Sequence, residues 1–138
     1  MKLFLDANVV LDVLAAREPY LKASAQILGL VERGKVKGFI AAHSVTTIHY
    51  LLSKHLTRKR AQAAIVQLLN VLQVAPVDHA VILQALSLGW PDFEDAVQAA
   101  TALNIKATVL ITRNPRDFKT LPIEVLTPEE WLQSSGDA

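Results

Sequence analysis

Three clusters of polar side chains contain the residue types from which a hydrolytic site is built. They are Asp6 with Asn8, then Asp92, Glu94 and Asp95, and finally Thr112, Arg113, Asn114 and Asp117. Carboxylates held close together repel one another and raise each other's pKa, and a divalent cation removes that repulsion. Ligands that are all oxygen favour Mg²⁺ or Mn²⁺, ions that activate water for phosphodiester hydrolysis.

Other chemistries lack their residues. The 138-residue chain has no cysteine, so disulfides, thiolate zinc sites and cysteine nucleophiles are excluded. It has no glycine-rich phosphate loop and no serine in a nucleophile elbow. The chain has four histidines, His43, His49, His55 and His79. No two of them are spaced i, i+4 along a helix, as a zinc-binding pair would be. Trp90 and Trp131 are isolated, and we interpret both as packing residues.

The elements that must position the polar clusters form an alternating pattern. Five short apolar runs predict strands at residues 2–5, 37–42, 71–77, 107–111 and 123–126. Helical spacing and capping residues predict helices at 9–14, 20–33, 44–55, 57–72, 78–88 and 91–103, with a last one from 127. Short connections between alternating elements indicate an α/β domain with a parallel sheet.

The polar clusters lie where such a sheet forms its sites, outside the carboxyl ends of the strands. Small residues at Ala96, Ala99 and Ala100 let the helix that Asp92 opens pack close to the sheet, so its acids approach Asp6. Helix capping alone explains each acid individually: Asp6 as a cap, Asp92 and Asp95 as a near capping box. Independent caps need not fall at neighbouring strand ends, which favours a joint site.

Composition sets the wider class. Hydrophobic residues make up 51% of the chain, which excludes intrinsic disorder, and no apolar run approaches the roughly 18 residues of a membrane span. Asp6 interrupts the first apolar run too early for a signal peptide. We therefore expect one cytoplasmic domain over 1–138, without membrane contact and with a frayed tail from about residue 134.

The net charge of +1 conceals a segregation along the chain. Residues 33–77 contain no acid but hold seven bases, which are Arg33, Lys35, Lys37, Lys54, Arg58, Lys59 and Arg60. Such asymmetry indicates a polyanionic partner such as nucleic acid. A solvated basic helix face is the alternative interpretation.

At the polar clusters the sequence resembles the PIN-domain family. The matching stretches are Leu5-Asp6-Ala7-Asn8-Val9-Val10-Leu11, Asp92-Phe93-Glu94-Asp95-Ala96 and Ile111-Thr112-Arg113-Asn114-Pro115-Arg116-Asp117-Phe118. The resemblance covers essentially the whole chain and is strongest to small stand-alone proteins of the VapC toxin kind. It implies a three-layer α/β/α fold with a five-stranded parallel sheet and an acidic pocket for Mg²⁺ or Mn²⁺. It also implies cleavage of single-stranded or structured RNA, a homodimer, and a cognate antitoxin protein.

The resemblance assigns roles by position. Asp6 and Asp95 match metal-binding acids, Thr112 matches a hydroxyl that hydrogen-bonds the acids, and Asn8 matches the polar residue beside the first acid. Two positions depart from the family pattern: His49 stands where a glutamate is usual, and Asn114 where an aspartate is usual. Asp92, Glu94 or Asp117 is expected to compensate by orienting or deprotonating the attacking water. We therefore expect these three acids to belong to the site as well.

Basic residues are expected to contact the RNA. Arg113 and Arg116 lie beside the predicted pocket, where they would hold phosphates next to the scissile one. Lys54, Arg58, Lys59 and Arg60 would follow the RNA backbone, with strong salt dependence. His49 would contact phosphate or carry a proton.

Two other functions remain open from the sequence. The reduced acidic set is compatible with a PIN-like domain that binds RNA without cutting it. A phosphoacceptor signalling domain also collects acids and Mg²⁺ at strand ends, but it needs an aspartate after the third strand. Asp78 is a poor candidate for that position.

Overall fold

A five-stranded, wholly parallel sheet forms the centre of the protein in the computed structural model, which describes residues 1–135. The strands are β1 (Lys2–Leu5), β2 (Lys37–Ala41), β3 (Gln73–Ala75), β4 (Val109–Ile111) and β5 (Glu124–Leu126), in the order β3-β2-β1-β4-β5. The chain winds outward from β1 to β3 and then returns to the other side of β1. Strand order therefore reverses between β1 and β4, where open α/β sheets form a crevice at their carboxyl ends.

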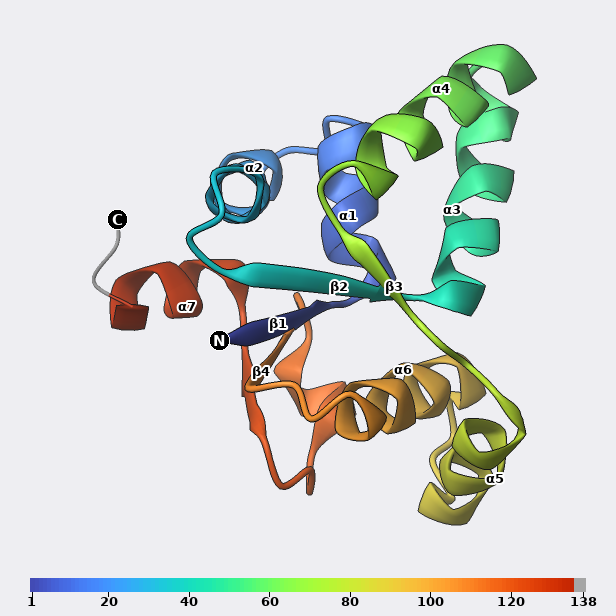
Figure 1. Ribbon diagram of the computed structural model, residues 1–138, viewed down its shortest axis with the longest axis vertical. Helices are drawn as coiled ribbons and strands as arrows, with labels where there is room; N and C mark the ends of the chain where they lie inside the picture. The colour runs from blue at the N-terminus through green and yellow to red at the C-terminus, as the bar shows by residue number, and fades with distance from the viewer. Residues whose placement is uncertain (136–138) are drawn as a thin grey trace.

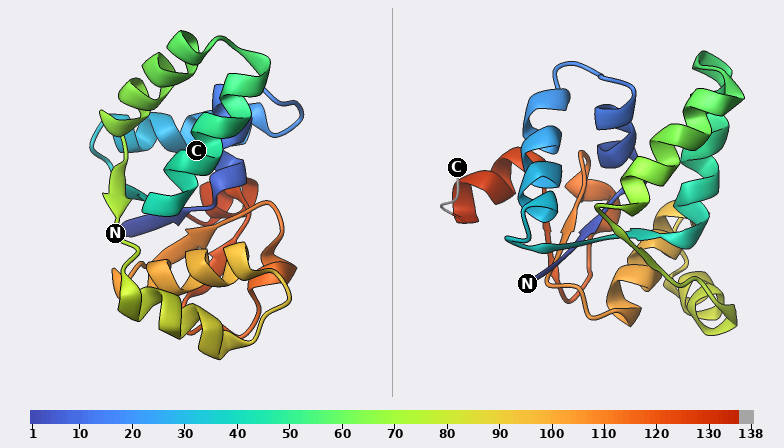
Figure 2. Two further views of the ribbon diagram at one scale, coloured as in Figure 1. Left: turned by 90° about the vertical axis from the view of Figure 1, so that its right-hand side faces the viewer. Right: turned by 45° about the horizontal axis from the view of Figure 1, so that its top comes forward.

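Helices cover both faces of the sheet (Figures 1 and 2). One face carries α1 (Ala7–Leu14), α2 (Leu21–Glu32), α3 (Ala42–His55), α4 (Arg58–Leu69) and α7 (Pro128–Ser135). The other carries α5 (His79–Leu88), α6 (Phe93–Asn104) and the short 3₁₀ helix η1 (Pro115–Phe118). This confirms the expected three-layer α/β/α fold. None of the described helices is long and apolar enough to cross a membrane.

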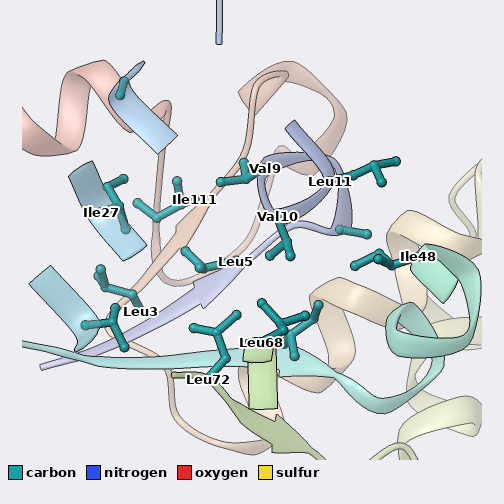
Figure 3. Close-up of a cluster of buried hydrophobic side chains, with 14 of the residues drawn as sticks. Leu3, Leu5, Val9, Val10, Leu11, Ile27, Ile48, Leu68, Leu72 and Ile111 are labelled. Carbon is teal, nitrogen blue, oxygen red and sulfur yellow. The ribbon is translucent and has the colours of Figure 1, made fainter. Parts of the chain in front are cut away.

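Alternation along β1 divides the core into two layers. Leu3 and Leu5 belong to the cluster under α1, α2 and α7 (Figure 3), whereas Phe4 belongs to the cluster that includes Ala99 and Phe118. Successive side chains of a strand point to opposite faces, so a strand buried on both faces is a continuous apolar run. The five predicted strands are all present, with β3 and β4 much shorter than predicted. This reason holds for the inner strands β1, β2 and β4, whereas the edge strands β3 and β5 are more exposed.

Some predicted boundaries are wrong. Ser44 does not cap α3, because that helix begins at Ala42 directly after β2. Ser44 is buried within the first turn, where its hydroxyl has no hydrogen-bond partner among residues 1–135. The predicted helix 57–72 ends at Leu69, since the chain turns at Asn70 to enter β3.

The expected frayed tail is wrong for Ser134 and Ser135, which complete α7. Trp131 and Leu132 bury this helix against the core, and the two serine hydroxyls donate to the carbonyls of Trp131 and Leu132. Burial of two large apolar side chains supplies the anchor that a chain end otherwise lacks. The remaining part of that expectation, residues 136–138, lies outside the described residues.

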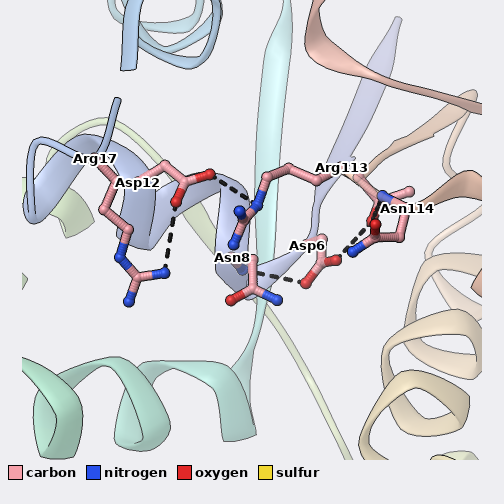
Figure 4. Close-up of polar contacts among 7 residues, drawn as sticks. Asp6, Asn8, Asp12, Arg17, Arg113 and Asn114 are labelled. Carbon is pink, nitrogen blue, oxygen red and sulfur yellow. Dashed lines mark hydrogen bonds and ion pairs between the residues drawn. The ribbon is translucent and has the colours of Figure 1, made fainter. Parts of the chain in front are cut away.

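A buried ion pair joins α1 to the loop after β4. The Asp12 side chain is fully buried, and its Oδ2 lies 3.0 Å from Nε of Arg113, while Oδ1 lies 3.6 Å from Nη1 of Arg17 (Figure 4). The guanidinium of Arg113 also stacks over the ring of Tyr20, 4.1 Å from its centroid. Burial raises the pKa of Asp12, and Arg113 and Arg17 oppose that shift. The contact fixes the segment that follows β4.

The substitution Asp12→Asn tests this ion pair. Removing one partner of a buried pair leaves the other uncompensated, so we expect a loss of about 3 kcal/mol in the free energy of unfolding. The double variant Asp12→Leu with Arg113→Met should recover most of that loss, because it removes both charges and keeps apolar volume. Urea denaturation with an unchanged m-value measures both effects. A loss below about 0.5 kcal/mol in Asp12→Asn contradicts a structural role for the pair.

Candidate active site

Asp6 stands immediately after β1, at the crevice between β1 and β4. Its side chain is 4% exposed and accepts three hydrogen bonds (Figure 4 shows its surroundings). The Thr112 hydroxyl donates to Oδ2 at 2.7 Å, while the backbone N–H of Asn8 and Nε2 of Gln98 each donate to Oδ1 at 3.2 Å. Donors aimed at a carboxylate stabilise its charged form. The Asn8 contact also makes Asp6 the N-cap of α1, as the capping interpretation predicted.

Gln98 is a residue of the site that the sequence did not indicate. It is 1% exposed on α6, and its Oε1 accepts the backbone N–H of Ala7 at 2.9 Å while its amide donates to Asp6. One side chain thus binds both the carboxylate and the first peptide of α1. A buried glutamine on an alanine-rich helix face is the signal that could have identified it, since buried polar groups require partners.

Asp95 lies at the centre of the acidic cluster. Burial, which is the largest cause, and then the charges of Asp92, Asp6, Asp117 and Glu94 together raise its pKa to about 7. The predicted approach of α6 to Asp6 is therefore confirmed, because Asp6 influences Asp95 across a separation of 89 residues in the chain. The two segments meet because the alanines of α6, Ala96, Ala99 and Ala100, are almost completely buried.

The other acids surround Asp95 with less burial. Asp92 is the N-cap of α6, and its Oδ1 accepts the backbone N–H of Asp95 at 3.0 Å, so capping is part of its role. Glu94 accepts a long hydrogen bond of 3.4 Å from the Thr47 hydroxyl on α3. Asp117 is exposed in η1. Asp92, Asp95 and Asp117 line a common cleft of about 420 Å³ together with Arg116.

Thr112 and Asn114 extend the cluster after β4. Thr112 is fully buried, and besides donating to Asp6 its hydroxyl accepts the backbone N–H of Asn114 at 3.2 Å. The side chain of Asn114 is exposed at the start of η1. The Arg113 ion pair with Asp12 holds this segment, so Thr112 is presented to Asp6 from a fixed backbone.

Helix α3 brings histidine rather than glutamate toward the acids. His49 is half-buried on α3, and its ring has no hydrogen-bond partner within residues 1–135. His43 lies about one and a half helical turns before His49 on α3, and the charge of Glu94 influences its pKa. Burial lowers the pKa of His43 and Glu94 opposes that shift, which shows that the first turn of α3 faces the acidic cluster.

The donor chemistry of the cluster fits a hard divalent cation. All candidate ligands are carboxylate oxygens. Burial is the main cause of the raised pKa of Asp95, and the repulsion from the neighbouring acids that adds to it is what a cation would relieve. Within residues 1–135, no group of three His, Asp or Glu side chains stands close enough to hold one ion. An ion bound there would therefore be held by one or two of these carboxylates, with waters completing its coordination.

The predicted basic residues divide into two places. Arg116 is exposed beside the acids, whereas Arg113 is occupied by Asp12 and Tyr20. Lys54, Arg58, Lys59 and Arg60 are exposed at the tip of the α3–α4 hairpin, the end of α3 remote from the sheet (Figure 1). Since α3 has 14 residues, about 20 Å separates that tip from the start of α3 near the acids. The structure does not bring this basic segment into the acidic cluster.

Comparison with known proteins places the chain in a family. A family model described as PIN domain matches residues 2–116. Ribonuclease VapC1 of Aquifex aeolicus is 31% identical over 137 residues, covering 96% of this chain and 94% of that protein. The matched region contains all the acids of the cluster except Asp117, which follows it by one residue.

Solved structures share the fold at lower identity. VapBC2 from Rickettsia felis, bound to a promoter DNA fragment, has a TM-score of 0.70 at 18% identity, covering 91% of this chain and 97% of that chain. VapBC-1 from nontypeable Haemophilus influenzae has a TM-score of 0.70 at 18% identity, covering 94% and 99%. VapC20 of Mycobacterium tuberculosis, a toxin that cleaves the sarcin-ricin loop, has a TM-score of 0.63 at 17% identity, covering 78% and 86%. With the family model and the 31% identical relative, they lead to one conclusion: this chain belongs to the PIN-domain family.

Proposed function

We propose that this protein is a metal-dependent endoribonuclease that cleaves single-stranded RNA and acts as the toxin of a toxin–antitoxin pair. The observation that carries the proposal is the cleft that Asp92, Asp95 and Asp117 line together at the carboxyl end of the sheet. The similarity to Ribonuclease VapC1 over nearly the whole chain supports the ribonuclease activity. A phosphoacceptor function has no comparable support, since Asp78 caps α5 and accepts the backbone N–H of Val81.

Asp6 and Asp95 are the residues that would hold Mg²⁺ or Mn²⁺. When bound, such an ion stabilises the charge that develops on the phosphate and lowers the pKa of a coordinated water. Asp6 is fixed by Thr112 and Gln98, so its carboxylate is oriented before any ligand arrives. Preorganised groups of this kind need no rearrangement at the moment of reaction.

The remaining acids would act on the attacking water. Asp92, Glu94 or Asp117 would orient it or accept its proton, because all three lie close enough to Asp95 to raise its pKa. Asn114 would hydrogen-bond a water without adding charge, and His49 would contact phosphate or carry a proton. Asn8 contributes its backbone N–H to Asp6.

RNA would be held by cations outside the acidic cluster. Arg116 lines the same cleft as Asp92, Asp95 and Asp117. The hairpin tip with Lys54, Arg58, Lys59 and Arg60 would follow the RNA backbone about 20 Å away, which corresponds to several nucleotides. Arg113 would contribute through its position next to Thr112, since its guanidinium is engaged with Asp12.

We also propose a cognate antitoxin protein, a homodimer and a cytoplasmic location. The structural neighbours from Rickettsia felis and Haemophilus influenzae are VapBC proteins, and a Klebsiella pneumoniae neighbour is described as a toxin-antitoxin complex. Apolar side chains exposed on the α3–α4 hairpin, Tyr50, Val66 and Leu69, are available for a second copy. Light scattering of the purified chain, alone and with the product of its neighbouring small gene, measures both assemblies.

A PIN domain that binds RNA without cutting it is the second candidate. The observation that favours it is the absence, within residues 1–135, of three acidic or histidine side chains near enough to share an ion. His49 in place of glutamate on α3 points in the same direction. RNA binding with no cleavage in Mg²⁺ or Mn²⁺ is the result that would select this candidate.

The substitutions Asp6→Asn and Asp95→Asn test the nuclease. Each should reduce cleavage of a single-stranded RNA by about 100-fold or more, because each removes a charged oxygen ligand and several kcal/mol of stabilisation from the transition state. Glu32→Gln, an exposed acid at the end of α2, is the matched control and should keep full activity. Rates are measured by gel with Mg²⁺ and Mn²⁺; full activity in both site variants overturns the assignment.

The raised pKa of Asp95 gives a second test, on stability without metal. Folded Asp95 retains its proton up to about pH 7, whereas the unfolded chain releases it near the ordinary value of 3.8. The folded state binds more protons over this range, so this contribution to stability is present below pH 4 and is lost as pH rises through 7. Asp95→Asn should therefore have a higher Tm than the wild type at pH 8 in EDTA, and an equal Tm at pH 4.

The stabilisation of the protein by a bound metal should depend on pH over the range in which Asp95 loses its proton. A cation competes with the proton on Asp95, so the rise in Tm caused by Mn²⁺ should be larger at pH 8 than at pH 6. The Asp95→Asn variant should show little rise at either pH. Thermal unfolding followed by circular dichroism measures both quantities, and a Mn²⁺ effect that is independent of pH counts against Asp95 as a ligand.

A further inference from the structure

The cleft beside Asp95 contains more than acids. Its volume is about 420 Å³, and its wall includes the indole of Trp90 and the cations Arg116 and Lys119, in addition to Asp95 and Asp117. A second hollow of about 310 Å³, on the side of Arg113, shares Arg116 and Asp117 with the first. The two hollows therefore adjoin along η1 and together form a path past the acidic cluster.

Trp90 is held rigidly at the wall of the cleft. Its ring meets that of Phe118 edge to face, with centroids 5.8 Å apart and planes at 83°. Phe118 is 1% exposed in the core, so it is a fixed support. The sequence predicted packing for this residue, and Trp90 does pack against two apolar clusters. It is nevertheless only partly buried and lines the cleft.

Arg116 and Lys119 carry charges that nothing in the described chain neutralises. Both side chains are exposed, and the ion pairs among residues 1–135 are those of Asp12 with Arg17 and Arg113. Acidic neighbours line the same cleft, yet neither cation pairs with them. Two free cations next to an aromatic face match the phosphodiester and the base of a nucleotide.

We propose that Trp90, Arg116 and Lys119 form a subsite for one unpaired nucleotide of the RNA, adjacent to the phosphate that is cut. The indole stacks on the base, and the two cations bind the phosphates on either side of it. This subsite rests on the proposed ribonuclease function, to which it adds a reason for single-strand preference. A base inside a duplex has both faces covered by its neighbours, so it cannot stack on Trp90.

The experiment measures binding without metal, so that it does not depend on cleavage. In a Trp131→Phe background Trp90 is the one tryptophan left, because the chain has two. A single-stranded RNA octamer in EDTA should quench its fluorescence, and a blunt RNA duplex of equal length should not. Trp131 is 3% exposed, so in the converse Trp90→Phe protein the octamer should leave the fluorescence unchanged.

Affinity variants separate stacking from folding. Trp90→Leu keeps an apolar side chain against Phe118 and should weaken octamer binding about tenfold, measured by fluorescence polarisation. Trp90→Phe keeps an aromatic face and should retain most of the affinity. Circular dichroism verifies that both variants are folded. Equal affinity of Trp90→Leu and wild type, together with no quenching, overturns the subsite.

The cations are tested by salt dependence. Arg116→Gln and Lys119→Gln should each lower the slope of log affinity against log salt by about 0.7, the value for one phosphate contact on a single strand. Lys106→Gln, an exposed lysine just beyond the end of α6 that is remote from Asp92, is the matched control and should leave the slope unchanged. Unchanged slopes in both cleft variants overturn the phosphate contacts.

The two proposals fail in different ways. Binding that depends on Trp90 in a protein that cuts no RNA supports the subsite and overturns the nuclease. Cleavage that is lost in Asp6→Asn, with octamer binding indifferent to Trp90, overturns the subsite and supports the nuclease.

Discussion

The hydrogen bonds to the buried carboxylate of Asp6 are the constraint on which the site depends. A carboxylate that is 4% exposed is stable only when its oxygens have partners, and here the donors come from α1, α6 and the segment after β4. Each donor requires a different part of the fold: β1 beside β4 for Thr112, and α6 close against the sheet for Gln98. The central position of β1 in the sheet satisfies both requirements at once.

Around the fixed carboxylate of Asp6, acidic side chains repel one another. Asp95 is half-buried among four other acids, and its pKa is raised to about 7. Nearby cations do not relieve this repulsion, since Arg113 and Arg17 are directed to Asp12 instead. Arg113 and Arg17 thus stabilise the segments that position the site, and they leave the negative potential of the acidic cluster in place. Retained repulsion of this kind is expected where a protein gives up stability in order to bind a cation.

The sequence predicted the strands and the convergence of the acids well, because both depend on local patterns. A strand buried on both faces is an unbroken apolar run, as Leu3-Phe4-Leu5 is, and polar residues that directly follow such strands, such as Asp6 and Thr112, gather at one edge of a parallel sheet. The family resemblance, which the comparisons confirmed, added the three-layer arrangement. The roles proposed for individual acids and for the metal remain predictions.

What the sequence could not supply was the direction of long side chains and the partners of buried polar groups. Arg113 was assigned to phosphate because it follows a strand, yet it turns back to Asp12, a residue hidden in an apolar helix. Gln98 gains its role only when β1 packs beside α6, which no local pattern encodes. Ser44 has the residue type of a cap, but β2 leads directly into α3 without a loop.

The residues that donate hydrogen bonds to Asp6 lie far from it in the sequence, and this separation also determines when the site can form during folding. The hydrogen bonds from Gln98 and Thr112 close separations of 92 and 106 residues. Contacts between such distant segments form late in folding, after the entropy of a long loop has been overcome. During synthesis, Asp6 emerges first and Thr112 only after four fifths of the chain. A growing chain therefore carries an incomplete acidic cluster until most of the protein has been made.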